Sequence, residues 1–224
     1  MITFPLGNKA TGVVFNKQLM PHIFNISKTV DRVSFSEELT ASIVTFSRYE
    51  QGINNDCGYN QTDTWIIRDS VVVGKGTSES GTFYEGFLRF PNIALAQGTV
   101  VIGAYLYLSP GGGSSYPTYM DIVVEEADNP ANIATIGDYL GRSWSTSKIN
   151  FDIESSPVGE VISPDITTLV QAILNRPGWV SGNAISFAIV PAADAIYSKF
   201  ISFYGWHSDP FYATEPKLVI GYSS

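Results

Sequence analysis

The sequence predicts an all-β fold, an antiparallel β-sandwich of the jelly-roll kind, and three observations lead to that prediction. From about residue 41 onward, short apolar stretches alternate with clusters of turn-forming residues. Within several stretches, apolar and polar side chains alternate with a period of two, which is typical of antiparallel sheets with one face on a core. Aromatic residues make up 13% of the 224 residues and charged residues only 15%, a composition that suits a sheet-rich domain.

The stretch VVIGAYLYL shows this alternation most clearly. Ala104, Leu106 and Leu108 fall on one face of the expected strand, whereas Tyr105 and Tyr107 fall on the other. Similar reasoning predicts further short strands along the chain. Together, the expected strands cover residues 42–46, 64–68, 71–74, 83–90, 100–108, 119–126, 147–153, 159–163, 184–190, 199–205 and 217–222.

Two connections between these strands are expected to be hairpins. The segment PGGGSSYP, residues 110–117, is rich in glycine, serine and proline, so it reads as a flexible hairpin connection. Residues 207–210, with the sequence HSDP, are expected to join the last two strands in a closing hairpin.

One segment, PDITTLVQAILNRPGW, breaks the β pattern. Counted from Ile166, apolar residues recur at positions i, i+3, i+4 and i+7, which predicts a short helix over about 165–175. Ser163 or Asp165 can cap its start, and Pro177 follows its end. We expect this helix to close one open end of the sandwich.

Residues 1–40 have no sustained period, and we interpret them as an N-terminal arm or docking element before a β-sandwich domain over residues 41–224. The alternative is that they form a first strand pair of the same domain. The first 15 residues lack a basic segment followed by an apolar one, so no signal peptide is expected. No run of about 18 apolar residues predicts a membrane span.

Charge and cysteine content narrow the expected partners. The net charge is −8, and the sequence has no basic run, which disfavours a nucleic-acid partner because non-specific binding to the phosphate backbone rests on lysine and arginine. Cys57 is the single cysteine, so the chain forms no disulfide within itself and has no cysteine-based metal knuckle.

The order of several motifs resembles the DNRLRE family, a β-sandwich module that is also grouped with carbohydrate-binding modules. These motifs are FLRFPNI (87–93), TVVIGAYLYL (99–108), the helix segment (164–179), the pattern W-x-S-D (206–209) and EPKLVIGY (215–222), and GYNQTDTWIIRDSVVVG (58–74) fits the beginning of the family pattern. The resemblance spans roughly 45–222. The sequence of residues 125–146 is similar to that of the module in bacteriophage structural proteins.

The resemblance implies a non-enzymatic structural component of a bacteriophage virion, namely a tail, fibre or capsid-decoration protein that presents the sandwich on the particle surface. The partners would be other virion proteins and further copies of the chain, because virion parts assemble symmetrically. The alternative is a polysaccharide-binding module of a secreted or surface protein. Both readings are compatible with binding to host surface glycans, and neither involves a nucleic acid or a membrane.

Aromatic residues are the strongest binding signal, because exposed rings stack on sugars and are enriched at protein interfaces. The candidates for a ligand or interface site are Trp206, Tyr212, Tyr105, Tyr107 and Tyr119. We expect the last three to share the non-core face of neighbouring strands. For Tyr105 and Tyr107, the alternative is burial under a second layer or under the N-terminal segment.

No catalytic residues are expected. His207 and Asp209 could suggest a general base with an orienting carboxylate, but no nucleophile motif accompanies them. We interpret them as loop residues between two strands.

No cofactor is expected either, with calcium as the alternative. The densest acidic stretch holds Glu125 and Asp128 and is interpreted as solvated surface, because it lacks the regular spacing of a calcium loop. Asp152 and Glu154 share a strand face and are the weak candidates for a Ca²⁺ site.

Overall fold

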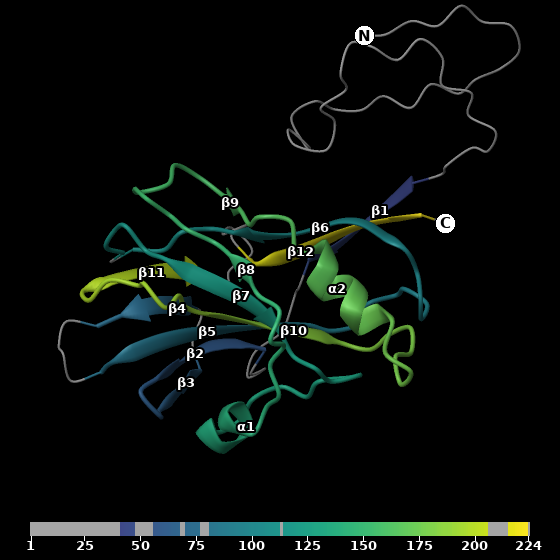
Figure 1. Ribbon diagram of the computed structural model, residues 1–224, viewed down its shortest axis with the longest axis horizontal. Coiled ribbons are helices and arrows are strands. Elements are labelled where there is room, and N and C mark those ends of the chain that lie inside the picture. Colours follow the sequence, from purple (N-terminus) through teal and green to yellow (C-terminus); the bar gives the residue numbers. More distant parts are fainter. Residues whose placement is uncertain are drawn as a thin grey trace, which may run out of the picture. The chain divides into compact units, whose positions relative to one another are not determined.

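The computed structural model describes residues 41–47, 56–67, 70–76, 81–112, 114–205 and 215–223. It confirms the all-β class, since two antiparallel sheets and two short helices make up the regular structure of this part of the chain (Figure 1). Among the described residues, neither helix is long and apolar enough to cross a membrane.

The smaller sheet has four strands in the order β1-β12-β6-β9. Its strands are β1 (Ala41–Ser47), β12 (Lys217–Ser223), β6 (Val101–Leu108) and β9 (Val161–Ile162). β12 is antiparallel to both of its neighbours, with Ile220 opposite Val44 on one side and Ala104 on the other.

The larger sheet has eight strands, six of which follow the order β11-β4-β5-β10-β7-β8, while β2 and β3 are attached to it through β5. Its strands are β2 (Cys57–Gln61), β3 (Trp65–Ile67), β4 (Ser70–Lys75), β5 (Phe83–Phe90), β7 (Met120–Val124), β8 (Ile149–Asn150), β10 (Ile185–Pro191) and β11 (Lys199–Tyr204).

The main hydrophobic core lies between the two sheets. Leu106 and Leu108 of β6 enter it from the four-stranded sheet, and Phe90 of β5 and Ile122 of β7 enter it from the other sheet; all four side chains are buried. The alternation of apolar residues predicted these inward faces, because successive side chains of a strand point to opposite sides.

The predicted helix is present as α2 (Thr167–Leu174). Its buried residues join the main core, and it packs against β6 and β7, one strand from each sheet (Figure 1). Of the two expected caps, Asp165 accepts a hydrogen bond from the Thr167 backbone N–H at 2.8 Å. Ser163 instead accepts from the Leu106 backbone N–H at 2.9 Å, so it holds the chain against β6.

Both expected hairpin connections are wrong. β6 and β7 belong to different sheets, and so do β11 and β12, so each connection crosses from one sheet to the other. The segment after β6 lies along β11, where the Ser115 backbone N–H donates to the Phe200 carbonyl at 2.7 Å and Phe200 donates back at 3.1 Å. Alternation shows which residues face a core, but it does not show which sheet a strand joins.

The sequence reasoning missed α1 (Ile136–Leu140) and the strand β2. A five-residue helix is too short for a periodic signal, although Thr135 and Asp138 form a capping box at its start. The stretches expected as strands over 147–153 and 159–163 are reduced to the two-residue strands β8 and β9.

Gly86 of β5 allows the neighbouring strand β4 to pack closely over it. A methyl group at this position would collide with the Val71 side chain and lie 3.0 Å from Cγ2 of Val73. Both valines are fully buried and have stiff, branched side chains, so they have little freedom to move aside.

We therefore expect Gly86→Ala to lower the free energy of unfolding by about 1–3 kcal/mol, because overpacking a dense core forces neighbouring groups to shift. Chemical denaturation of the full chain measures this change. Gly112→Ala is the matched control, since an added methyl group there meets nothing within 4 Å. Equal stabilities of the two variants would contradict the proposed close packing.

Candidate functional site

Tyr105 and Tyr107 both lie on the outer face of β6, away from the core. The cross-strand register places Val219 opposite Tyr105, and it places Lys217 and Ile162 on the two sides of Tyr107. The two rings therefore lie in a row of side chains that runs across three strands of the four-stranded sheet.

Aliphatic side chains extend this surface toward the beginning of β6. Ile102 is 46% exposed and Val100 is 57% exposed, while Val101 between them faces the core. Ile102 lies over Gly221, since a Cβ on this glycine would be 3.4 Å from Cγ1 of Ile102. We call this surface the tyrosine face and define it by Val100, Ile102, Tyr105, Tyr107, Ile162 and Val219.

An ion pair between described residues borders the tyrosine face. The ammonium of Lys217 lies 5.6 Å from the centroid of the Tyr107 ring and 3.0 Å from Oε1 of Glu160. Partial burial is the main cause that raises the pKa of Tyr107, and Glu160 raises it further, while Lys217 lowers it. The pKa of Tyr105 is also raised, by partial burial first and then by Asp165. At neutral pH the surface therefore presents neutral phenols.

A groove of about 490 Å³ begins at Lys217, next to the tyrosine face. This volume is within the range of small-ligand sites in proteins. Tyr204, which ends β11, is 40% exposed and lines the groove. The complete lining is Ser109, Pro110, Pro157, Gly159, Glu160, Tyr204 and Lys217.

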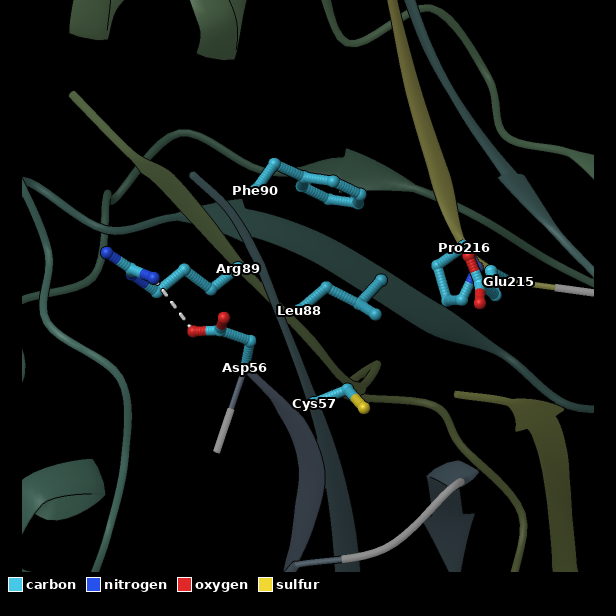
Figure 2. A pocket seen from close by; sticks show the side chains of 7 residues that line it. All are labelled: Asp56, Cys57, Leu88, Arg89, Phe90, Glu215 and Pro216. Carbon is cyan, nitrogen blue, oxygen red and sulfur yellow. Dashed lines mark hydrogen bonds and ion pairs between the residues drawn. The ribbon is translucent and has the colours of Figure 1, made fainter. Parts of the chain in front are cut away.

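A second cavity, beside the buried Cys57, is too small for a ligand. Its volume is about 10 Å³, which is close to the lower limit for one water molecule. The Arg89 guanidinium is 2.9 Å from the Asp56 carboxylate at its edge, and Leu88 and Phe90 form its apolar wall (Figure 2). This arrangement has the character of a packing defect closed by an ion pair.

Tyr119 does not share a face with the other two tyrosines, so that expectation is wrong. It immediately precedes β7, in the eight-stranded sheet, whereas Tyr105 and Tyr107 are in the four-stranded sheet. The separation follows from the crossing between sheets after β6. Trp206 and Tyr212, together with His207 and Asp209, lie outside the described residues.

The weak calcium candidates lie near Tyr119. Asp152, Glu154 and Asp194 all raise the pKa of its hydroxyl, although desolvation is the largest cause. Asp152 accepts a hydrogen bond from the Asn150 amide at 3.0 Å. Within the described ranges, no three His, Cys, Asp or Glu side chains are grouped so that they could hold a metal ion. Calcium at Asp152 and Glu154 stays an expectation from the sequence.

Part of the outer face of the eight-stranded sheet, around β3 and β5, is covered by a second, aromatic cluster. Phe87 of β5, Ile133 and Tyr139 of α1 are buried in it, and Trp65 and Trp144 pack against them. The rings of Trp65 and Tyr139 are stacked with centroids 5.4 Å apart. Figure 1 shows α1 on this side, next to β2 and β3. Burial, with Glu85 nearby, raises the pKa of Tyr139 above its ordinary value.

Glu125 is buried against this cluster, which contradicts its interpretation as solvated surface, whereas Glu126 and Asp138 of the same acidic stretch are exposed. Its carboxylate pairs with the buried Arg142 guanidinium, which also lies over the Phe87 ring. Desolvation raises the pKa of Glu125, although Arg142 acts in the opposite direction. Asp128 of the same stretch is paired with Arg176 at 2.5 Å. Local acidity could not reveal these pairs, because both arginines are distant in sequence.

Sequence reasoning found the two tyrosines of the face but missed Lys217, Ile162 and Tyr204. The sequence signal for these three residues was weak, because they belong to β12, β9 and β11. Their position near β6 depends on the strand order, which the sequence does not show. The alternation in β12 does place Lys217 and Val219 away from the core, so only their neighbours remained unknown.

The comparisons with known proteins yield similarities to solved structures only. No family model matches the chain, and no curated protein matches it. Among solved structures, the chain is similar to a chain of Desmodium yellow mottle tymovirus, with a TM-score of 0.24 and 10% sequence identity, over 88% of this chain and 97% of that chain. A TM-score this low does not establish a shared fold. The resemblance to the DNRLRE family rests on the sequence motifs alone.

Removing Arg142 is expected to make stability strongly dependent on pH. In Arg142→Met, Glu125 is left buried without its partner, which costs about 3–5 kcal/mol of the free energy of unfolding near pH 7. Loss of Arg142 raises the folded-state pKa of Glu125 further. Because an acid with a raised folded-state pKa destabilises the fold as pH rises, the cost shrinks as the pH falls toward the ordinary value of 4.5.

Urea unfolding of this variant and the wild type across this pH range measures the effect. The control is the double variant with Glu125→Gln and Arg142→Met, whose deficit relative to the wild type should vary less with pH because it lacks the buried acid. A deficit of Arg142→Met that is independent of pH would show that Glu125 is not the source.

Proposed function

We propose that this chain is a non-enzymatic structural component of a virus particle, namely a bacteriophage tail, fibre or capsid-decoration protein. In this role, the β-sandwich is a rigid surface module that contacts other proteins through the tyrosine face. The observation that carries the proposal is the unequal covering of the two sheets. The aromatic cluster covers the outer face of the eight-stranded sheet around Phe87 of β5, whereas the tyrosine face keeps apolar side chains up to 57% exposed.

Exposed apolar side chains that adjoin one another mark interaction surfaces more often than single exposed ones do. Tyrosine supplies a large contact area and a hydroxyl at low entropic cost, which is why it is enriched at interfaces. The similarity of the sequence motifs to phage structural proteins supports the particle as the place where such a surface is used.

Residues 1–40 provide the attachment of the module to the particle in this proposal. Their sequence lacks the strand period of the rest, which suits a segment whose role is separate from that of the sandwich. The described domain then remains available for contacts at the particle surface.

Replacing residues 1–40 by a glycine–serine segment of equal length is expected to reduce incorporation into particles at least about 10-fold, the effect of losing roughly 1.4 kcal/mol of binding free energy. Quantitative mass spectrometry of particles purified on a density gradient measures incorporation. The thermal unfolding transition of the purified variant serves as the control that the module is folded. Absence of the wild-type chain from the purified particles would overturn the virion role itself.

Polysaccharide binding is the second candidate function, and the groove beside Lys217 favours it. An exposed tyrosine ring and two prolines provide apolar surface, while Ser109, Glu160 and Lys217 provide hydrogen-bonding groups. Such a mixture suits a sugar ring, which has apolar faces and polar edges. Because the only cation of the groove is paired with Glu160, a neutral glycan fits better than an acidic one.

Tyr204→Ala is expected to weaken glycan binding about 10-fold, since the loss of one stacking aromatic removes on the order of 1–1.5 kcal/mol. Affinity electrophoresis in gels that contain neutral polysaccharides measures the change. Tyr197→Ala is the matched control, because Tyr197 is 47% exposed but lies outside the groove. If both variants migrate like the wild type in every gel that retards it, the groove is not the binding site.

A further inference from the structure

The layers of the molecule are incomplete on one side. In order, the described residues form the aromatic cluster, the eight-stranded sheet, the main core and the four-stranded sheet. No described segment covers the tyrosine face, where Ile102 is 46% and Ile162 is 43% exposed. β-sheets with one apolar face are normally covered by another sheet or by helices. The surface that best fits a sheet face is a second sheet face.

The tyrosine face is uncharged, which favours a partner whose contact surface is also uncharged. Its members carry no charge at neutral pH, and the adjoining Lys217 is paired with Glu160. The chain as a whole has a net charge of −8, so two copies repel each other unless they approach through a neutral surface. A basic partner would have no electrostatic attraction to this face, because the members of the face are uncharged.

The ion pair at the border makes the surface complementary to itself. Lys217 and Glu160 are each about one-third exposed, so each can also reach an oppositely charged group on a facing surface. In a two-fold arrangement every contact occurs twice, with the same patch on both partners. A border that carries one cation next to one anion satisfies this requirement.

The available area sets the strength of such a contact. β6 has eight residues, or about 27 Å at about 3.4 Å per residue, and strands about 4.8 Å apart give the sheet a width of about 15–19 Å. Each copy thus contributes flat area on the order of 400–500 Å², or about 800–1,000 Å² for two copies. Specific interfaces begin near 1,000 Å², so the contact is weak in solution.

We propose that the tyrosine face is the interface with a second copy of this chain, in which two four-stranded sheets pack face to face across a two-fold axis. This inference rests on the proposed function as a module for protein contacts, and it specifies the partner. The expected dissociation constant is in the micromolar range, which suits a contact that is repeated many times in a larger assembly.

Sedimentation velocity of the full chain over a concentration series tests the proposal. The wild type is expected to form dimers as its concentration rises. Ile102→Lys should raise the dissociation constant at least about 10-fold, since it places like charges in the contact. Ile196→Lys is the matched control: Ile196 is 43% exposed in the loop before β11, and its substitution should leave dimerisation unchanged.

A mixing experiment tests whether the two faces meet each other. Lys217→Glu makes the border of the face acidic and Glu160→Lys makes it basic, so each variant should remain monomeric. An equimolar mixture of the two variants should recover dimers, because an acidic border then meets a basic one. Failure of the mixture to dimerise would overturn the face-to-face arrangement. A monomeric wild type, or a dimer that Ile102→Lys leaves intact, would overturn the interface.

These outcomes are distinct from failure of the virion role. A monomeric chain that is nevertheless incorporated into particles overturns only the self-contact. Conversely, a dimer that is absent from particles overturns only the virion role, because it shows that the tyrosine face joins two copies in solution.

Discussion

The alternation of side chains along β6 from Ala104 to Leu108 is the constraint on which the rest of the structure depends. Leu106 and Leu108 must enter the core, so Tyr105 and Tyr107 are directed to the opposite face. A shift of the strand by one residue would exchange these faces, and would place two phenol rings in a core that accommodates leucines. Packing of the core therefore fixes the position of the rings that form the candidate site.

The two sheets meet this constraint in different ways. In the eight-stranded sheet, the residues of β7 that face away from the core are buried as well, because the chain after β7 folds back over them. This second layer buries the carboxylate of Glu125, which is unfavourable. The Arg142 guanidinium compensates by pairing with Glu125, and it also lies over the Phe87 ring. In the four-stranded sheet, the outward residues remain at the surface. This difference leaves the four-stranded sheet with an exposed apolar outer face.

Prediction from the sequence succeeded where a property is local. The period of two identified most of the longer strands and their inward faces, although it missed β2. The helical spacing from Ile166 identified α2, because both patterns lie within one segment. Prediction failed where a property depends on strand order. The two connections read as hairpins cross between sheets, and Tyr119 is separated from Tyr105 for the same reason. For the candidate site, the rings on β6 were predictable, but their neighbours on β9 and β12 were not.

The tyrosine face and the groove are not independent, since Lys217 belongs to the border of one and to the lining of the other. Its ammonium lies against the Tyr107 ring and is paired with Glu160, whose side chain lines the groove. A sugar hydroxyl that hydrogen-bonds Glu160 or Lys217 would occupy atoms that a facing copy could otherwise contact. A facing copy would in the same way occupy atoms that the sugar needs. Linkage requires both effects to have the same magnitude. If the chain has both proposed activities, glycan binding and self-association would compete for the exposed parts of the same ion pair, and each would then weaken the other.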